Sequence, residues 1–492
     1  MTAGNTVGGL LTDFYSLTMA QGYWKEDRHR RCVFEFFFRR QPFAGGYAVF
    51  AGLETLLDNL AAFAFSADDI GYLRSLGVFD EGFLAYLRDF RFAGTLRAAD
   101  EGTTVFPHEP LVRVEGSRIE CQLVEGLLLN TLNFQTLVAT KARRIWLASG
   151  RGKVTEFGMR RSQGPDGALS AARAAYIGGA SGTSNTLAGK MHGIPVVGTM
   201  AHSWVMSFDD EREAFAAYAR LYPGNCVFLI DTYNTLKSGI RCALEAGAEL
   251  RKAGRSFGVR LDSGDIQYLS SQVRLRLDEA GFGDAEITVS GDLDESIISL
   301  LHESGAPVDT WGVGTRMVTA GSDPAFTGVY KMAAREGADG GAMTQVMKFS
   351  DNPEKTTNPG VKQVWRVRDA AGSPVADLMT LDDEPPPQAG SRLLFRHPAA
   401  DYRHFYHTPA AAPQPLLKKR LENGRRLRPA APLAEIRTRS LADFDTFDPT
   451  YKRLLNPHDY KVSVSALLCD LKLRLIKKHF GSPDAPVPGG GG

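Results

Sequence analysis

The chain has 492 residues, of which 43% are hydrophobic, and its 57 lysines and arginines nearly balance its 56 aspartates and glutamates. This length exceeds the roughly 100–200 residues usual for one domain and predicts two or three packed units. The balanced charge argues against a nucleic-acid or anionic-membrane partner. The N-terminus lacks a signal-peptide pattern and no apolar run is long enough to cross a bilayer, so we expect a soluble, cytoplasmic protein. That expectation fits the cysteines, which have neither metal-ligand nor disulfide spacing: Cys32, Cys121, Cys226, Cys242 and Cys469.

The first 150 residues mix helix and strand patterns. The stretches FEFFFRR and YAVFAGLE indicate a strand and a strand that leads into a helix. Residues 80–90 have the pattern of a short amphipathic helix. A longer helix is predicted over residues 126–148, because neither proline nor glycine occurs from Leu127 until Gly150. We expect an N-terminal α+β domain over residues 1–150.

Strand and helix patterns alternate from Lys153 onward. Apolar runs predict strands that start near Val154, Pro195, Val227, Val259, Ile287 and Thr310, and helices are predicted over residues 235–253 and 296–304. This alternation is typical of βαβ units, so we expect an irregular or incomplete α/β (TIM-like) barrel over residues 151–335, with a seventh strand near residues 329–332. An open doubly wound sheet is the alternative, which we disfavour because no GxGxxG follows the first strand.

The sequence becomes rich in glycine and proline after Ala333, with DDEPPP at residues 382–387 and short strand patterns such as VKQVWRV. We expect a loop-rich C-terminal unit over residues 336–480 and a flexible tail over residues 481–492. The basic run at residues 416–428 (LLKKRLENGRRLR) is open to two interpretations. An RNA-binding patch is one, and the solvated face of a helix is the one that we favour.

Polar loops follow the apolar runs of the predicted barrel, where α/β enzymes place their chemistry. Asp231 and Asp262 each come directly after a strand, so their carboxylates should meet at the barrel mouth, where they can accept ribose hydroxyls or hold Mg²⁺ through water. Capping of helix N-termini is the structural alternative for both. Arg260 precedes Asp262 by two residues and should share its face of the strand. Such an arginine can bind a carboxylate or phosphate with two hydrogen bonds.

The loops after the last two strands contain Gly291 and the run Gly312-Val313-Gly314-Thr315. Glycines at this position let backbone N–H groups approach phosphate oxygens, although they can also simply make tight turns. After the first strand, Phe157 lies close to Arg160, a combination suited to a flat anionic ring. His202 follows the Pro-Val-Val run, where it is equally compatible with a structural role and with a role as nucleophile or base.

These segments together resemble the nicotinate phosphoribosyltransferase family. The resemblance runs from about Leu11 to past residue 460. It is carried by LLTDFYSLTMAQGYW, FEFFFRRQPFAGGYAVFAGL, EPLVRVEG, EFGMRRSQGPDGALSAARAAYIGGASGTSNTLAG, GTMAHSW, LIDTYNT, VRLDSGD, SGDLDE, WGVGTRM and KFSDNPEKTTNPGVKQVWR.

The resemblance implies a type II phosphoribosyltransferase, with an α/β barrel beside a domain built from N- and C-terminal segments. It implies a reaction of nicotinate with 5-phosphoribosyl 1-pyrophosphate that yields nicotinate mononucleotide and pyrophosphate, in the Preiss-Handler route of NAD salvage. ATP is the implied co-substrate, hydrolysed in a ligase-type cycle through a phosphohistidine, and Mg²⁺ or Mn²⁺ is the implied metal. The family also implies a head-to-tail homodimer in which each active site is completed by the partner chain.

The resemblance also assigns roles to single residues. His202 matches the phosphorylated histidine of the GTxAHS motif, and Thr199 and Arg260 match positions that bind nicotinate. Tyr15 matches the tyrosine that stacks on the ring from the partner subunit, and Phe157 the second ring-stacking aromatic. The remaining matches lie on the phosphoribosyl pyrophosphate side: Arg160 near the ribose phosphate, Asp231 and Asp262 on the ribose and metal side, and Gly291, Gly314 and Thr315 in the phosphate cradle.

One departure distinguishes between substrates. Related nicotinamide enzymes carry an aspartate in a GTDTxAG stretch, where it accepts a hydrogen bond from the amide, whereas this chain has GTSNTLAG with Asn185 at that position when aligned on Ala188-Gly189. An aspartate would repel the carboxylate of nicotinate, so Asn185 favours the acid substrate. We disfavour two further readings. An aldolase or epimerase barrel needs a lysine or metal-binding histidines at strand ends, and a catalytically dead metabolite sensor or scaffold should have lost some of His202, Arg260 or Asp262.

Overall fold

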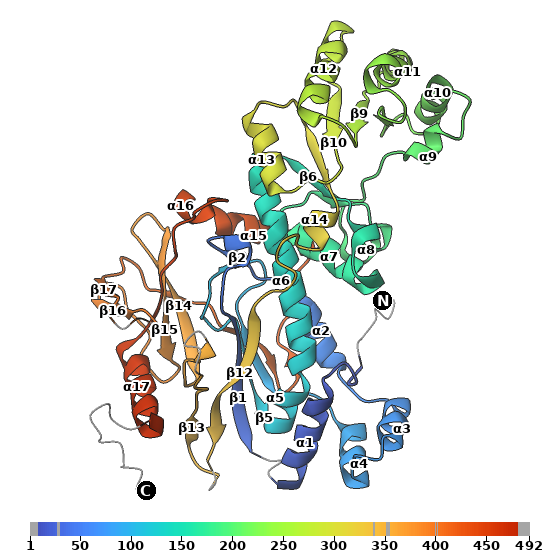
Figure 1. The fold of residues 1–492 in the computed structure, drawn as a ribbon. Coiled ribbons are helices and arrows are strands. Elements are labelled where there is room, and N and C mark those ends of the chain that lie inside the picture. Colours follow the sequence, from blue (N-terminus) through green and yellow to red (C-terminus); the bar gives the residue numbers. More distant parts are fainter. Residues whose placement is uncertain are drawn as a thin grey trace, which may run out of the picture. The chain divides into compact units, whose positions relative to one another are not determined.

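The computed structural model describes residues 8–26, 30–337, 340–350, 355–398, 400 and 402–480. The chain divides into two compact units (Figure 1). Unit 1 combines residues 1–134, 325–431 and 442–492, and unit 2 combines residues 135–324 with 432–441. Two of the four boundaries fall within helices, one in α6 (Glu125–Ala148) and one in α15 (Leu433–Asp445). The expected domain ranges stay a prediction, and the expected tail at 481–492 lies outside the described residues.

Unit 1 contains a seven-stranded sheet in the order β13-β12-β1-β5-β3-β19-β20. The central strand β1 (Arg31–Phe38) pairs antiparallel with β12 (Gly328–Glu336) on one side and with β5 (Val112–Ser117) on the other. Residues 32–36 and Phe38 are buried without alternation and Phe37 is half-buried, which is the pattern of a strand covered on both faces. The outer strands are β13 (Met343–Gln345), β3 (Thr95–Ala98), β19 (Lys418–Glu422) and β20 (Arg425–Arg426).

A six-stranded sheet and several helices complete unit 1. The sheet has the order β17-β16-β21-β15-β14-β18, and two short strands, β2 and β4, pair separately. The strand bounds are β14 Lys362–Arg368, β15 Pro374–Leu381, β16 Leu393–Arg396, β17 His404–His407, β18 Gln414–Pro415, β21 Val462–Val464, β2 Ala48–Val49 and β4 Thr104–Val105. The helices are α1 Phe14–Glu26, η1 Pro42–Ala44, α2 Leu53–Ala62, α3 Ala67–Ser75, α4 Glu81–Asp89, α5 Arg118–Leu123, α16 Pro449–Lys452 and α17 Ala466–Phe480.

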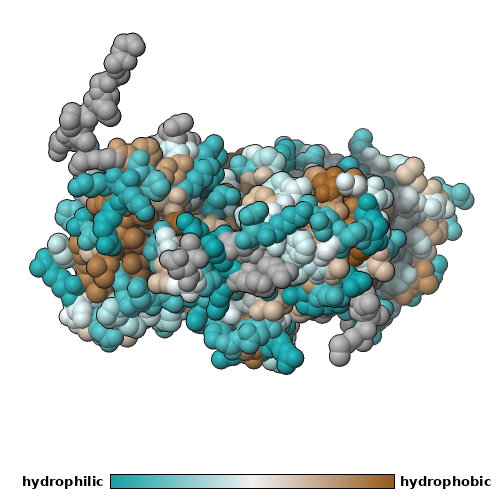
Figure 2. All heavy atoms as spheres, turned by 90° about the horizontal axis from the view of Figure 1, so that it is seen from below, coloured by the Kyte–Doolittle hydropathy of each residue, from teal (hydrophilic) through white to brown (hydrophobic). Residues whose placement is uncertain are grey.

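The surface of the molecule seen from below mixes hydrophilic residues with separate hydrophobic patches (Figure 2). Several large apolar side chains of unit 1 are exposed in and just before α1, among them Leu11, Phe14, Tyr15 and Met19. No helix among the described residues is long and apolar enough to span a membrane.

Unit 2 is built around a six-stranded parallel sheet in the order β7-β6-β11-β10-β9-β8. Its strands are β6 Lys153–Glu156, β7 Gly182–Thr183, β8 Val227–Leu229, β9 Gly258–Leu261, β10 Glu286–Val289 and β11 Thr310–Val313. Its helices are η2 Met159–Arg161, α7 Gly164–Gly178, α8 Thr186–His192, α9 His202–Val205, α10 Glu211–Leu221, η3 Thr235–Gly239, α11 Ile240–Lys252, α12 Ile266–Glu279, α13 Glu295–Glu303 and α14 Thr315–Val318. Most of these elements are green to yellow in Figure 1.

This parallel sheet confirms the expected α/β class with an incomplete barrel. Within the described part of the chain the end strands β7 and β8 do not pair, so the strands form no closed ring. The predicted helices at 80–90, 126–148, 235–253 and 296–304 are present as α4, α6, η3 with α11, and α13. Helix α4 begins after Asp80, whose side chain accepts a hydrogen bond from the Gly82 N–H.

Two expected barrel strands were wrong. The segment near Pro195 makes only an isolated parallel bridge, Thr183 with Val196, and the short strand β7 takes the sheet position beside β6. Residues 329–332 lie in β12, which is antiparallel to β1 in unit 1 rather than part of the parallel sheet. The aromatic side chains explain this placement, because Tyr330 stacks on Phe34 with ring centroids 4.8 Å apart.

The helix expected for the basic run 416–428 was also wrong. The run forms the hairpin β19–β20, which turns at Asn423 and Gly424, both with positive φ. An Asn-Gly pair favours such a tight turn, because both residues tolerate the left-handed region.

Candidate functional site

A polar cluster lies at the carboxyl ends of the parallel strands of unit 2, with Arg260 of β9 at its centre. The Arg260 guanidinium donates three hydrogen bonds: Nε to Ser290 Oγ at 2.7 Å, Nη1 to Thr199 Oγ1 at 3.0 Å and Nη2 to Asp262 Oδ1 at 2.7 Å. It also lies 5.5 Å from the centroid of the Phe157 ring. The expected sharing of one face by Arg260 and Asp262 is therefore confirmed. The cluster places a positive charge beside an aromatic ring.

Asp262 is held in its ionised form by its neighbours. Burial by itself would raise the pKa of this carboxyl, but the Ser290 hydroxyl, the Arg260 guanidinium and the His202 imidazole together lower it below its ordinary value. Ser290 Oγ donates a short hydrogen bond to the same Asp262 oxygen that Arg260 contacts. Asp262 is thus a carboxylate available to pair with a cation or to accept hydroxyl groups.

The Asp231 side chain is hydrogen-bonded to the backbone of Asp262. Its Oδ2 accepts hydrogen bonds from the Asp262 N–H at 3.0 Å and from the Ser263 hydroxyl at 2.6 Å. Its Oδ1 is buried and has no hydrogen-bond partner among the described residues. A buried carboxylate oxygen without a donor is costly unless a cation or a hydroxyl meets it, so this atom marks a place where a ligand fits.

His202 begins helix α9 and faces the same cluster. Its Nδ1 lies 3.1 Å from Thr232 Oγ1, and its Nε2 lies 3.9 Å from Asp262 Oδ2. The side chain is 42% exposed, so solvent and substrates can reach it. The contact with Thr232 orients the ring and leaves Nε2 directed toward the carboxylate side of the cluster.

Glycines within β11 and after β10 and β11 allow close packing around Phe157 and Asp262. A Cβ on Gly312 would come within 2.6 Å of the Phe157 ring and 3.2 Å of Ser290 Cβ. A Cβ on Gly314 would lie 3.1 Å from the Phe157 carbonyl oxygen. Gly291 has a φ of 100°, and a Cβ there would lie 2.6 Å from the Asp262 carbonyl oxygen. These glycines keep the ring and the two loops in place, and their role as a phosphate cradle stays a prediction.

Four other predicted residues lie apart from this hydrogen-bonded cluster. Arg160 is exposed in η2, and Thr315 is the first residue of α14, where its carbonyl accepts a hydrogen bond from Thr319 Oγ1 at 2.7 Å. Asn185 is buried, and its Oδ1 caps α8 by accepting from the Ala188 N–H at 3.1 Å. Tyr15 is 49% exposed in α1 of unit 1. Its hydroxyl has a raised pKa, because of burial first and then the charges of Glu125 and Asp13.

Four residues that complete the cluster or support it were not predicted as site residues from the sequence: Thr232, Ser263, Ser290 and Glu156. The first three are hydroxyls beside the predicted acids and histidine. Glu156 ends β6 and is buried, and it accepts hydrogen bonds from Thr183 Oγ1 at 2.6 Å and from the Gly158 N–H. Burial raises the pKa of Glu156 in spite of these two donors. A carboxylate directly before Phe157-Gly158, at the end of a strand, was the available signal.

No group of three or more His, Cys, Asp or Glu side chains that could by itself hold a metal ion is present in the described ranges. The pair Asp231 and Asp262 nevertheless suits Mg²⁺, which is commonly bound by one or two carboxylates together with water and substrate phosphates.

Comparison with known proteins gives a consistent result along the chain. The family model of the nicotinate phosphoribosyltransferase N-terminal domain matches residues 10–133, that of the nicotinate phosphoribosyltransferase family matches residues 152–370, and that of the C-terminal domain matches residues 361–472. The nicotinate phosphoribosyltransferase of Bacillus subtilis (strain 168) is 42% identical over 458 residues, which are 93% of this chain and 92% of the relative.

Human proteins of this kind are similar in sequence and in structure. The Homo sapiens nicotinate phosphoribosyltransferase is 36% identical over 518 residues, which cover 93% of this chain and 95% of the relative. The crystal structure of human nicotinic acid phosphoribosyltransferase superposes with a TM-score of 0.82 at 33% identity, covering 95% of this chain and 100% of that chain.

Proposed function

The chain belongs to the nicotinate phosphoribosyltransferase family, and we propose that it joins nicotinate to 5-phosphoribosyl 1-pyrophosphate at the Arg260 cluster of unit 2. The products are nicotinate mononucleotide and pyrophosphate, which places the protein in NAD salvage by the Preiss-Handler route in the cytoplasm. The observation that carries the proposal is the Arg260 guanidinium, which is supported by Asp262, Ser290 and Thr199 beside the Phe157 ring.

Nicotinate recognition follows from that arrangement. The substrate is a flat ring with one carboxylate, and a guanidinium pairs with a carboxylate through two parallel hydrogen bonds. Thr199 adds a hydroxyl donor next to Arg260, while Phe157 offers a face on which the pyridine ring stacks. Asn185 carries no charge, so it does not repel the bound carboxylate.

The transfer step is a displacement at the anomeric carbon of the ribose. The pyridine nitrogen attacks that carbon, the bond to the pyrophosphate oxygen breaks, and the electron pair leaves with pyrophosphate. Positive charge builds up on the ribose ring as the bond breaks, and the ionised Asp262 stabilises it, while Asp262 and Asp231 accept the ribose hydroxyls. Phe157 and Arg260 hold the nicotinate in line for attack. Gly291, Gly314, Thr315 and Arg160 are the residues proposed to hold the phosphate groups.

Asp231 and Asp262 are also the residues that would hold Mg²⁺, or Mn²⁺, through water. The buried Oδ1 of Asp231, which has no partner among the described residues, fits that assignment. A divalent cation bound here supplies neutralisation of the pyrophosphate charge.

His202 is the proposed site of phosphorylation by ATP. In that step the imidazole nitrogen attacks the γ-phosphorus of ATP, the bond from that phosphorus to the β–γ bridging oxygen breaks, and ADP leaves; water later hydrolyses the phosphohistidine and releases phosphate. With Nδ1 against Thr232, Nε2 is the nitrogen open to the phosphoryl group. The added charge and acceptor oxygens would order the loops around phosphoribosyl pyrophosphate, so that ATP turnover drives the condensation.

We further propose a homodimer in which Tyr15 reaches the nicotinate ring of the partner's site. The half-exposed Tyr15 ring lies among other exposed apolar side chains in α1 of unit 1, which is the composition of a surface that is covered in an assembly.

The deciding experiment measures nicotinate mononucleotide formation from nicotinate, phosphoribosyl pyrophosphate and Mg²⁺, with and without ATP. A parallel reaction contains nicotinamide in place of nicotinate. Turnover of nicotinate that ATP stimulates is the expected result. Turnover of nicotinamide instead would contradict the role of Asn185, and turnover of neither would contradict the assigned reaction.

A further inference from the structure

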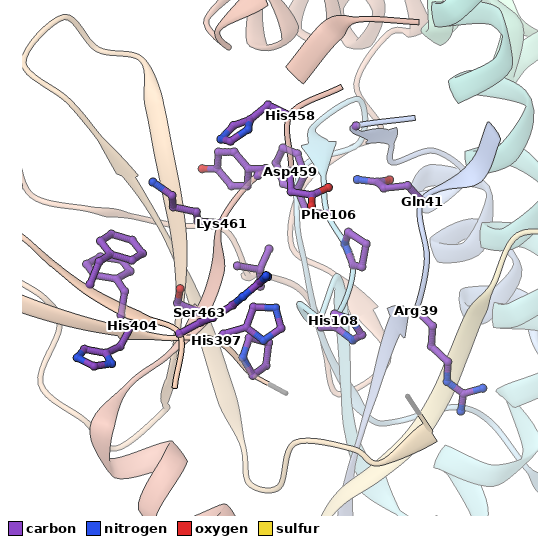
Figure 3. A pocket seen from close by; sticks show the side chains of 18 of the residues that line it. Arg39, Gln41, Phe106, His108, His397, His404, His458, Asp459, Lys461 and Ser463 are labelled. Atoms are coloured by element: carbon purple, nitrogen blue, oxygen red, sulfur yellow. The ribbon is translucent and has the colours of Figure 1, made fainter. Parts of the chain in front are cut away.

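Unit 1 contains a cavity of about 670 Å³, with Arg39 and Lys461 on opposite walls (Figure 3). These two cations therefore do not converge on one anion. The aromatic rings at this cavity have no open face for a ligand, because Phe106 is 1% and Phe395 0% exposed. A buried group of unit 2, the carboxylate of Glu156 at the end of β6, bears more directly on the reaction.

The Glu156 carboxylate is buried without a cation. The residue is 1% exposed, and among the described residues no lysine, arginine or histidine pairs with it. Both oxygens accept hydrogen bonds instead: Oε1 from the Gly158 N–H in a short contact, and Oε2 from Thr183 Oγ1 at 2.6 Å. Because an ionised group is costly to keep in the interior, this arrangement indicates a position at which two acceptors on one residue are needed.

The Thr183 hydroxyl connects Glu156 to Asn185. It accepts a hydrogen bond from the Asn185 N–H at 2.9 Å. An amide N–H only donates and an ionised carboxylate only accepts, so the single hydroxyl hydrogen of Thr183 must point to Glu156. Thr183 is 0% exposed, and water therefore cannot replace either partner. Since Asn185 also caps α8 with its side chain, the turn that carries it is fixed at both ends.

The other oxygen of Glu156 fixes the turn that follows Phe157. The Gly158 N–H donates to this oxygen, and the Phe157 N–H donates to the neighbouring strand β11 at 2.8 Å. A Cβ on Gly158 would overlap the side chain of Val318, so the turn has no room to shift. The ring that is held in this way is the one that lies 5.5 Å from the Arg260 guanidinium.

The backbone of Thr183 extends the same support toward Thr199. Its N–H donates to the Pro195 carbonyl at 3.0 Å, and its carbonyl accepts from the Val197 N–H at 2.9 Å. Thr199 follows two residues later, and its hydroxyl accepts from Arg260 Nη1. Three of the four residues of unit 2 that are proposed to bind nicotinate are therefore connected to one carboxylate by hydrogen bonds and short backbone segments.

We propose that Glu156 is a positioning residue, which holds the nicotinate-binding side chains of Asn185 and Phe157 in place. Its Oε2 acts through the Thr183 hydroxyl, and its Oε1 acts through the turn after the ring. The inference rests on the proposed function, in which these side chains surround the pyridine ring. Loss of this support should affect nicotinate before it affects phosphoribosyl pyrophosphate, whereas loss of a purely structural acid would affect both substrates alike.

Glu156→Gln tests the proposal on the full chain. Glutamine has the same shape but one acceptor oxygen, so it can accept from Gly158 or from Thr183 but not from both. In the assay with nicotinate, phosphoribosyl pyrophosphate and Mg²⁺, KM for nicotinate should rise at least about tenfold, as for the loss of one hydrogen bond to a charged group. KM for phosphoribosyl pyrophosphate should stay within about twofold of the parent value.

Two substitutions of Thr183 separate the hydrogen bond from the packing. Thr183→Val removes the hydroxyl and keeps the shape, so it should raise KM for nicotinate as Glu156→Gln does. Thr183→Ser keeps the hydroxyl and should have a KM close to that of the parent. Glu211→Gln is the matched control, since Glu211 is another acid of unit 2 that is 4% exposed and has no cation partner among the described residues. It should keep both KM values.

Hydrogen exchange of backbone amides gives a readout that needs no turnover. In the protein without substrate, the Asn185 amide should exchange at least about tenfold faster in Thr183→Val than in the parent or in Thr183→Ser. Exchange that is equal in all three would overturn the proposal.

The parent enzyme separates this inference from the proposed function. A parent that makes no nicotinate mononucleotide would overturn the proposed function and this inference with it. A parent that makes it, while Glu156→Gln and Thr183→Val keep its KM for nicotinate or raise both KM values alike, would overturn the role of Glu156 alone.

Discussion

The chemistry of the candidate active site depends on hydroxyl groups that hold charged ones. Among the described residues Arg260 pairs with one carboxylate, Asp262, and it also donates hydrogen bonds to Ser290 and Thr199. A hydroxyl can rotate and donate instead of accept, so Thr199 can turn its proton toward an incoming carboxylate while Arg260 stays in place. Replacing these hydroxyls by carboxylates would neutralise the guanidinium and remove its attraction for an anionic substrate.

Replacing His202 by alanine should uncouple ATP from transfer. We expect ATP to accelerate nicotinate mononucleotide formation in the parent and to have no effect on the variant. Slow transfer without ATP should remain, because Arg260 and Asp262 are intact. The measurement is the initial rate with and without ATP, together with phosphate release.

Ser203→Ala is the control for His202→Ala, since Ser203 is the neighbouring exposed residue and only its carbonyl is seen to accept a hydrogen bond, from Ser207. The control should keep the full stimulation by ATP. Stimulation that persists in His202→Ala would show that the phosphoryl group is not carried by this residue.

Asn185→Asp should shift the preference away from nicotinate. Aspartate caps a helix as well as asparagine does, so α8 and the fold are expected to persist. The new charge near the substrate carboxylate should lower kcat/KM for nicotinate about 10- to 100-fold, with a smaller effect on nicotinamide. Kinetics with both substrates measure this ratio, and Asn185→Ser provides an uncharged capping control. An unchanged ratio would leave Asn185 with the capping role alone.

The sequence predicted that Arg260 and Asp262 share one site, but it did not predict the hydrogen bond from Arg260 to Ser290. Residues two apart on one strand must share a face, so that contact is local. Ser290 reaches Arg260 from the neighbouring strand β10, in a register that pairs Thr288 with Arg260. Register between two parallel strands depends on the packing of the whole sheet, and no pattern within either strand encodes it.

At the scale of elements, the basic hairpin β19–β20 is fastened to its own unit by acidic side chains. Asp100 accepts from Lys418 Nζ and from Arg420 Nη2, each at 2.6 Å, and Arg426 contacts Glu54 and Asp58. These ion pairs neutralise much of the positive charge that made residues 416–428 resemble an RNA-binding patch. The Asn423-Gly424 turn was legible in the sequence as a hairpin signal, but the surrounding lysines and arginines favoured a helix interpretation.

Asp100→Asn should destabilise unit 1 only where Asp100 is ionised. Burial alone would raise the pKa of Asp100, but hydrogen bonds and charges from Lys418 and Arg420 outweigh it and lower the pKa from 3.8 to about 2. A carboxyl with a depressed folded-state pKa stabilises the fold above its unfolded pKa and loses this contribution as the pH falls toward the folded value. The expected loss is about 1–2 kcal/mol at neutral pH, after allowance for solvent screening.

Urea unfolding of parent and variant, from pH 7 down to the lowest pH at which the parent still unfolds cooperatively, measures this difference. The difference in the free energy of unfolding between the parent and Asp100→Asn should be constant around neutral pH and should become smaller below about pH 4. Asp89→Asn is the control, since Asp89 is 77% exposed and its ion pair is with the adjacent, exposed Arg88. A gap that does not change with pH would rule out the ion pairs as its source.

The strand near residues 329–332 was predicted as the seventh strand of the barrel but belongs to the sheet of unit 1. Alternation of strands and helices in the sequence does not decide which sheet such a strand joins. The run near residues 329–332 has the apolar character of a barrel strand and follows the last βα unit. It pairs instead with β1, where the rings of Phe34 and Tyr330 stack, and Phe38 contacts Phe326 with centroids 4.7 Å apart. The choice between two sheets depended on an aromatic core made by residues nearly 300 positions earlier.

At the scale of the whole molecule, the proposed homodimer predicts that two inactive chains can restore one active site. Tyr15→Ala removes the ring that one chain would lend, and Arg260→Ala disables the site that would receive it. In a heterodimer of these two variants, one site has both an intact Arg260 and an intact Tyr15, while the other site has neither. About half of the parent activity per dimer is expected.

Co-expression of the two variants with different affinity tags, followed by purification on both tags, isolates the heterodimers for this assay. Each variant purified alone serves as the control and should have little activity. Heterodimers no more active than the two separate variants would show that Tyr15 serves a site of its own chain, or none.

The pairing of β1 with β12 also determines how the protein can be made. Phe38 and its partner Gly328 are separated by 290 residues, and the ribosome adds about 5–20 residues per second. The phenylalanine-rich strand therefore leaves the ribosome roughly 15 to 60 seconds before its partner exists. During that interval β5 covers only one of its edges, and the other presents free backbone groups beside apolar side chains, a template for aggregation. We therefore expect a chaperone that shields this strand, or slower and cooler expression, to raise the soluble yield of newly made chains.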